Sequence, residues 1–152
     1  FMIVEGDKAG LSWVTILSRR EAYRKAYAQF DPKKVAKFDQ KKIEALLKNE
    51  GIIRNKLKIH SSINNSKLFL EIQKEFGNFD QYIWIFFGGK PIINKWKSRQ
   101  EMPATSKESD ALSKDLKKRG FKFCGSTIMY SHMQACGLVF DHMTDCFCYK
   151  RR

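Results

Sequence analysis

The sequence contains no apolar run long enough to cross a membrane and no segment with the basic, apolar and small-residue layout of a signal peptide. The alternation of apolar and polar residues that is typical of strands is nearly absent, and no repeat or low-complexity linker occurs. All four cysteines lie between positions 124 and 148, so we expect no disulfide framework. These absences argue against a membrane protein and a secreted disulfide-rich domain, and they favour a reducing, cytoplasmic setting.

Several common catalytic patterns are missing as well. There is no Ser-His-Asp set with suitable spacing, no phosphate loop of the nucleotide-hydrolase type and no pair of carboxylates in a glycine-rich frame. Enzymes built on those plans are therefore disfavoured.

The charge is strongly one-sided. The 152 residues include 29 Lys and Arg against 16 Asp and Glu, which gives a net charge of +13. A folded domain this basic commonly binds a polyanion, and nucleic acid is the first choice. The alternative is a basic surface without a partner. The charge is spread over the chain, so it predicts DNA or RNA without locating the interface.

Helical periodicity accounts for most of the chain. Ser12, Asp31 and Asp39 are the expected N-caps. Helices are predicted at 12–29, from 32, from 40 to before Gly51, at 55–76 and at 79–86, with a long loop at 88–105. We therefore expect an all-α protein, one compact domain over residues 1–152 with orthogonally packed helices.

A glycine-bounded corner between two further helices is the most informative stretch. Leu112 and Leu116 mark one face of a helix that should start near Ser109 and Asp110. After the corner, Ile128, Ser131, His132 and Ala135 recur at helical spacing up to Gly137, a C-cap.

Gly120 and Gly125 bracket this corner and can supply the positive φ angles of a tight turn. The second helix begins directly after it, so its unpaired N–H groups point outward and suit a phosphate. The run 117–119 and Lys122 add positive charge. The alternative is an ordinary helical corner with two buried phenylalanines.

Two small constellations could carry chemistry. Glu5 follows four apolar residues and precedes Trp13, so an acid and an aromatic could hold a flat cationic heterocycle. The alternative is a solvated helix end with a core tryptophan. His142 and Cys146 stand one helical turn apart and could share a Zn²⁺, although spacing alone also allows coincidence. Cys148 could be a third ligand, but its spacing of two from Cys146 suits a strand or loop better.

Four stretches resemble 3-methyladenine DNA glycosylase I, the constitutive bacterial alkylation-repair family of the helix-hairpin-helix superfamily. They are AGLSW at 9–13, GIIRNKLKI at 51–59, SDALSKDLKKRGFKFCGSTIMYSHMQACGLVFDH at 109–142, and the tail with Cys146 and Cys148. The likeness extends over essentially the whole chain. It implies a monofunctional glycosylase that acts as a monomer on double-stranded DNA with alkylated bases. The remaining alternative is a non-catalytic helix-hairpin-helix DNA-binding fragment.

The resemblance also assigns residues. Glu5 matches the acid that hydrogen-bonds the excised base, Trp13 the aromatic on which the base stacks, and Ser131 a polar residue nearby. Gly10 and Leu11 match the segment that fills the gap left in the duplex. The DNA-binding hairpin, which holds a phosphate, corresponds to Gly120, Phe121, Lys122, Gly125, Ser126 and Thr127.

The same family implies a structural zinc ion with His142 and Cys146 as two ligands, the other two being expected upstream of Phe1 in a segment that this chain lacks. Lys8 stands where the family commonly has Gln. An Asp after the hairpin assists water in many relatives, and Asp141 has that spacing, but this family does without such an acid. The lyase branch of the superfamily needs a Lys just after the hairpin. This chain has Gly-Ser-Thr there, at positions 125–127, so no strand cleavage is expected.

Overall fold

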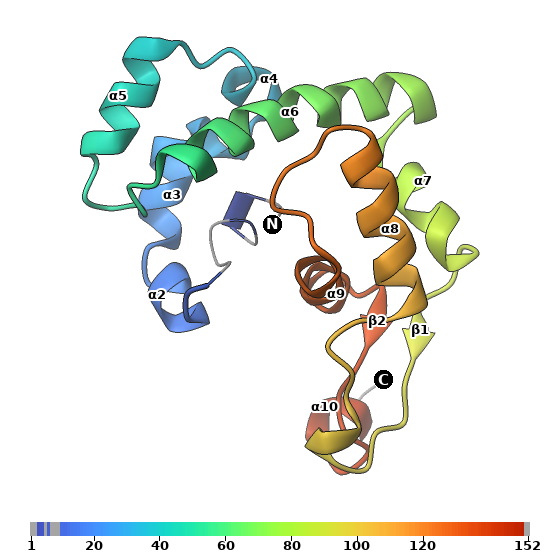
Figure 1. Cartoon of the computed structure of the whole chain (residues 1–152). Coiled ribbons are helices and arrows are strands. Elements are labelled where there is room, and N and C mark those ends of the chain that lie inside the picture. Colours follow the sequence, from blue (N-terminus) through green and yellow to red (C-terminus); the bar gives the residue numbers. More distant parts are fainter. Residues whose placement is uncertain (1–2, 5, 7–9, 151–152) are drawn as a thin grey trace.

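The computed structural model describes residues 3–4, 6 and 10–150 (Figure 1). The elements follow in the order α2 (Trp13–Leu17), α3 (Arg20–Ala26), η1 (Ala28–Phe30), α4 (Pro32–Val35), α5 (Gln40–Lys48), α6 (Lys56–Phe76), α7 (Phe79–Trp84), η2 (Ile85–Phe87), β1 (Ile92–Ile93), η3 (Arg99–Glu101), α8 (Lys107–Lys118), α9 (Ser126–Ala135), β2 (Val139–Phe140) and α10 (Phe147–Lys150). The all-α prediction is confirmed. In the described ranges, every helix is too short or too polar to span a membrane.

The long helix α6 runs across the molecule and supports two separate cores (Figure 1). Its first half contributes Ile59 and Ile63 to a core built from α2 to α5. Its second half contributes Ile72 to a core built from α7, α8 and α9. Both cores are apolar and tightly buried, so α6 fixes how the N-terminal helices stand relative to the α8–α9 corner.

The three predicted N-caps, Ser12, Asp31 and Asp39, are confirmed, and Asn55 caps α6 in the same way. The side chains of Ser12, Asp31, Asp39 and Asn55 each accept a hydrogen bond from a backbone N–H in the first turn of α2, α4, α5 and α6. These caps satisfy donors that would otherwise lack an intrahelical partner. The starts of these helices were predictable because a cap and its first turn are neighbours in sequence.

The single helix predicted at 12–29 is wrong, because the chain forms α2, α3 and η1 there. The Ser18 hydroxyl donates to the Thr15 carbonyl at 3.1 Å and competes with the helix ladder. At the break, the Arg19 guanidinium reaches the Glu50 carbonyl at 2.7 Å. Gln29 then takes a φ of 61° inside η1. One contact within the turn and one to a residue far along the chain thus accompany the division of the predicted helix.

The helix predicted to start near Ser109 and Asp110 begins earlier, because Ser106 is the N-cap of α8. The Ser106 hydroxyl accepts from the Ser109 N–H at 3.3 Å, and the Ser109 hydroxyl accepts from the Ser106 N–H at 2.8 Å. This reciprocal pair is a capping box. Both serines could cap a helix, and the pair places the start three residues before the predicted one.

The loop predicted at 88–105 contains more order than expected. β1 pairs in parallel with β2, with Ile92 opposite Val139 and Ile93 opposite Phe140, and η3 follows. The N–H of Ile92 donates to the Leu138 carbonyl at 2.9 Å. The loop is therefore held beside the chain that leaves α9.

Candidate functional site

The α8–α9 corner forms as predicted, but its backbone geometry differs from the expectation. Gly120 has a φ of 97°, as a tight turn requires. Gly125 does not share this role, because its φ is −61° and it is the N-cap of α9. The second left-handed residue is Phe123, with a φ of 52°. A phenylalanine in this conformation is uncommon, so surrounding contacts must hold the turn.

Side chains from α6 and α8 provide those contacts. The Asn65 amide accepts from the Lys122 N–H at 2.9 Å and donates to the Lys122 carbonyl at 2.8 Å. The Asn64 amide donates to the Gly120 carbonyl at 3.0 Å, and the Ser113 hydroxyl donates to the Cys124 carbonyl at 2.7 Å. The corner is therefore a rigid hairpin, since several of its carbonyls are bound by the helices beneath it.

These bonds also show which N–H groups remain for an anion. The N–H of Gly120 donates to Lys117, that of Phe121 to Leu116, and that of Lys122 to Asn65. The first turn of α9 has no side-chain cap, and the space around Gly125 is open. The donors suited to a phosphate therefore lie at the start of α9, at Gly125 and the residues that follow it.

Arg119 does not add its charge to that surface. Its guanidinium binds Asp115 at 2.8 Å and Glu75 at 2.5 Å, and it lies over the Phe76 and Tyr82 rings at 5.1 and 5.2 Å. Hydrogen bonds to the two carboxylates raise its pKa. The interpretation of 117–119 as a phosphate-facing run is wrong for this residue, which joins α8 to α6 and α7.

The outer charges near the hairpin come from lysines. Lys117, Lys118 and Lys122 are exposed. The Ser126 hydroxyl, however, is turned toward α8, where it donates to Asp110 and lies 2.8 Å from the Ser109 hydroxyl. An anion at the start of α9 would therefore be bound mainly by backbone N–H groups and lysines, on the side away from Asp110.

Among the predicted base-binding residues, Glu5 lies outside the described residues. Trp13 is half-buried against the N-terminal core, and Ser131 is half-buried on α9. Gly10 has a φ of 77° and precedes Leu11, whose exposed fraction is 37%. Val14 and Leu17 on α2 are exposed as well, which makes this edge of the molecule unusually apolar.

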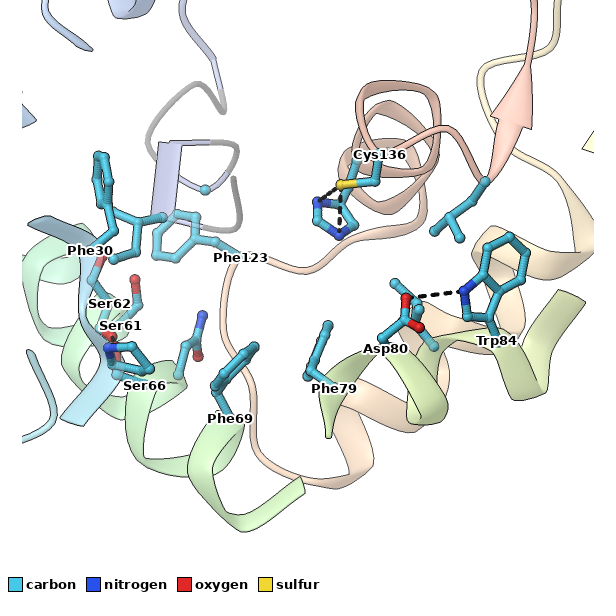
Figure 2. A pocket seen from close by; sticks show the side chains of 17 residues that line it. Phe30, Ser61, Ser62, Ser66, Phe69, Phe79, Asp80, Trp84, Phe123 and Cys136 are labelled. Atoms are coloured by element: carbon cyan, nitrogen blue, oxygen red, sulfur yellow. Dashed lines mark hydrogen bonds between the residues drawn. The ribbon is translucent and has the colours of Figure 1, made fainter. Parts of the chain in front are cut away.

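A cavity of about 390 Å³ lies between the two cores (Figure 2). Its volume is in the range of small-ligand sites. Most of the lining is aromatic or small and polar: Phe30, Ser61, Ser62, Asn65, Ser66, Phe69, Phe79, Asp80, Trp84, Phe123, His132 and Cys136. Ile3 and Gly6, on either side of Glu5, line it too, whereas Trp13 and Ser131 are not among its described lining residues.

His132 and Cys136, on the cavity wall, form a pair that sequence reasoning missed. The sulfur lies 3.7 Å from both ring nitrogens, as Figure 2 shows. Burial lowers the pKa of His132 from its ordinary value of 6.5 to about 4. Their spacing of one helical turn, the same as that of His142 and Cys146, was the sequence feature that could have predicted this contact.

Asp141 is a structural acid. Its carboxylate accepts hydrogen bonds from Asn94 at 2.6 Å, Trp96 at 2.8 Å, Tyr130 at 2.6 Å and Gln134 at 2.8 Å. Burial opposes ionisation, but these donors outweigh it and lower the pKa of the carboxyl. With four donors around it, the carboxylate joins the 88–105 loop to α9 and is not placed to activate water.

The C-terminal segment brings three metal-binding side chains together. The ligand atoms of His142, Cys146 and Cys148 lie within 4.8 Å of one another. The Cys146 sulfur is 3.6 Å from Nδ1 of His142. His142 is exposed and the two cysteines are half-buried, and this is the sole such group of three or more among the residues the structure describes.

Comparison with known proteins identifies the family. The methyladenine glycosylase family model matches residues 1–149. DNA-3-methyladenine glycosylase of Haemophilus influenzae and DNA-3-methyladenine glycosylase 1 of Escherichia coli are both 47% identical, over 95% and 96% of this chain and 78% of each relative. A crystal structure of 3-methyladenine DNA glycosylase I superposes with a TM-score of 0.92 at 48% identity, covering 96% of this chain and 80% of that one. The chain therefore belongs to the methyladenine glycosylase family.

Proposed function

We propose that the protein is a DNA base-excision repair enzyme that removes 3-methyladenine from alkylated DNA by hydrolysis of the N-glycosidic bond. The observation that carries this proposal is the 47% identity to two DNA-3-methyladenine glycosylases over nearly the whole chain. It outweighs the alternative of a DNA-binding fragment without chemistry, because the likeness extends over both cores and the residues between them.

The chemistry asks little of the protein beyond recognition. Alkylation at N3 makes adenine cationic and weakens its glycosidic bond, so the enzyme must extrude the nucleotide, bind the base and admit water. In this chain, Glu5 accepts hydrogen bonds from the base, Trp13 stacks on it and Ser131 contributes a polar contact. An anionic carboxylate beside an aromatic ring favours a cationic base over neutral adenine.

The duplex is held by a different part of the molecule. The start of α9 presents N–H groups near Gly125, and Thr127, Lys117, Lys118 and Lys122 are exposed around it. These groups bind a phosphate next to the lesion. The exposed Leu11, which follows Gly10, fills the place of the extruded nucleotide.

The enzyme acts without cleaving the strand. A lyase of this superfamily uses a lysine after the hairpin as nucleophile, and the first turn of α9 offers Gly125, Ser126 and Thr127 instead. The only lysine inside the hairpin is Lys122, whose backbone is bound by Asn65 and whose side chain is exposed. The expected product is an intact abasic strand. Because its substrate is chromosomal DNA and its relatives are bacterial, we place it in the bacterial cytoplasm.

His142 and Cys146 suit the structural zinc ion that the family resemblance implies. With Zn–S and Zn–N bonds of about 2.3 and 2.0–2.1 Å, two adjacent tetrahedral ligands lie about 3.5 Å apart. The observed separation of Nδ1 and sulfur is 3.6 Å. When bound, the ion would hold the C-terminal segment in place and take no part in base release.

The test is a product assay on methylated duplex DNA. Chromatography should detect free 3-methyladenine, and gel analysis should find breaks only after alkali treatment of the product. Breaks without alkali would contradict the assignment as a monofunctional glycosylase. Duplex binding without released base would favour the non-catalytic alternative.

A further inference from the structure

We propose that Phe123 is a positioning residue for base excision: its side chain keeps the segment that carries Glu5 at a fixed place relative to the hairpin that binds the phosphate. The inference rests on the proposed function and concerns a residue to which that function assigns no role. Phe123 lies in the hairpin between Gly120 and Gly125, and it lines the cavity between the two cores. Figure 2 shows its ring projecting from the hairpin toward Phe30.

The hairpin backbone directs this side chain into the cavity. Phe123 takes a φ of 52°, a left-handed conformation that a residue of this size rarely adopts. Its neighbours are held by helices on both sides. Asn65 of α6 binds the backbone of Lys122, and Ser113 of α8 binds the carbonyl of Cys124. The molecule therefore maintains a strained residue here, and such residues are concentrated at binding and catalytic sites.

The side chain meets the N-terminal segment at Gly6. A Cβ atom placed on Gly6 would lie 3.5 Å from the Cβ atom of Phe123, which is van der Waals contact. Ile3, which precedes Glu5 by two positions, lines the same cavity as Phe123. Since Gly6 follows Glu5 directly, a residue that packs against Gly6 determines where the acid meets a base in the cavity.

A buried lysine of α6 holds the ring. Lys58 is 7% exposed, and its ammonium nitrogen lies 5.9 Å from the centroid of the Phe123 ring, within the range of a cation–π interaction. The Lys58 carbonyl accepts hydrogen bonds from the Ser61 and Ser62 hydroxyls at 2.7 and 3.0 Å, and both serines line the cavity. A buried charge needs surrounding groups that stabilise it, and the face of an aromatic ring is one of them.

The variant Phe123→Gly tests the proposal with little risk to the hairpin, because glycine adopts a positive φ without strain. The phosphate-binding N–H groups at the start of α9 stay in place. We expect single-turnover release of 3-methyladenine from methylated duplex DNA to fall by about fivefold or more, while duplex affinity stays within about twofold. Phe123→Tyr, which keeps the ring, should release the base at close to the wild-type rate.

Two comparisons separate a positioning role from a merely structural one. In the Glu5→Gln background, Phe123→Gly should lower release by less than about a further twofold, because both changes remove the same recognition. Lys58→Met should lower release by about threefold, since it removes the cation from the ring. Lys42→Met is the matched control, because Lys42 lies 5.3 Å from the Phe38 ring at the N-terminal core, and it should match the wild type.

The outcomes separate this inference from the function on which it rests. Wild-type release by Phe123→Gly, an equal loss of duplex affinity, or a fully multiplicative loss in the double variant would overturn the role of Phe123 and leave the glycosylase assignment standing. A wild-type protein that releases no base would overturn the proposed function itself. If thermal unfolding shows that Phe123→Gly does not fold, Lys58→Met decides, and release no lower than that of Lys42→Met would overturn the inference.

Discussion

The molecule contains two His–Cys pairs with the same spacing, and they differ in almost every physical respect. His132 and Cys136 lie on α9 beside the cavity, with the imidazole buried. His142 and Cys146 lie beyond β2, where the imidazole is exposed. Among the described residues, the first pair belongs to no group of three metal-binding side chains, while the second is joined by Cys148.

Their geometry differs as well. The Cys136 sulfur is 3.7 Å from both nitrogens of His132, and an atom equidistant from both cannot lie along the in-plane lone pair of either. At the second pair, the sulfur approaches Nδ1 of His142 at 3.6 Å, the spacing of two zinc ligands. The i, i+4 spacing brings a His and a Cys together in both cases, but only the second pair has the direction of approach and the nearby third donor that a metal site needs.

The largest contrast should appear in zinc affinity. We expect His142→Ala to weaken zinc binding by about a hundredfold or more, because a structural zinc site of four ligands provides roughly 3 kcal/mol per ligand. His132→Ala, the matched change at the other pair, should leave the affinity within about twofold. Chelator competition measures both. Equal losses in the two variants would mean that the geometric distinction has no consequence.

The pH dependence of the free energy of unfolding should depend on His132, the buried member of the first pair. The pKa of His132 is about 4 in the folded protein and 6.5 ordinarily, so below pH 6.5 the unfolded chain takes up a proton that the folded chain does not. Stability from this group is complete above pH 6.5 and is lost as the pH falls toward 4, by about 2 kcal/mol between pH 7 and 5.

Urea unfolding at several pH values, with chelator present, measures this loss. The His132→Phe variant should lose about 2 kcal/mol less than the wild type over that interval. A wild-type slope in His132→Phe would mean that the buried imidazole is not the titrating group.

The smallest effect concerns thiol reactivity. Zinc should slow alkylation of Cys146 about tenfold, because a metal-bound thiolate is a poor nucleophile, and should leave Cys136 unchanged. Cys124 should react slowly with or without zinc, since burial raises its pKa. Peptide mapping by mass spectrometry resolves the four sites. Slower alkylation of Cys136 in the presence of zinc would contradict the claim that only the second pair binds the ion.

Features that depend on neighbours in sequence were the ones that could be predicted. The caps at Ser12, Asp31 and Asp39 are local, and so is the start of α9 directly after the hairpin. The predicted face of α9 was less accurate: Met129 and Met133 are buried, whereas Ala135 is exposed. The helix packs into the core of α7, α8 and α9 through its methionines and lines the cavity with His132, so its buried side is wider than one stripe.

Features that depend on distant contacts could not be predicted. Arg119 looks like a surface charge in sequence, but Glu75 and Tyr82 from other helices enclose it. The left-handed φ of Phe123 depends on contacts from α6 and α8 to its neighbours in the hairpin. The role of Glu5 came from family resemblance rather than from physics, and this residue lies outside the described part of the structure.

The measurement that tests the account most directly is single-turnover release of 3-methyladenine by Glu5→Gln, beside the duplex affinity of the same preparation. The proposed function assigns the base to Glu5 and the phosphate to the start of α9, so it predicts that release falls by about tenfold or more while duplex affinity stays within about twofold. Release at the wild-type rate, or an equal loss of duplex binding, would contradict this division between recognition of the base and binding of DNA.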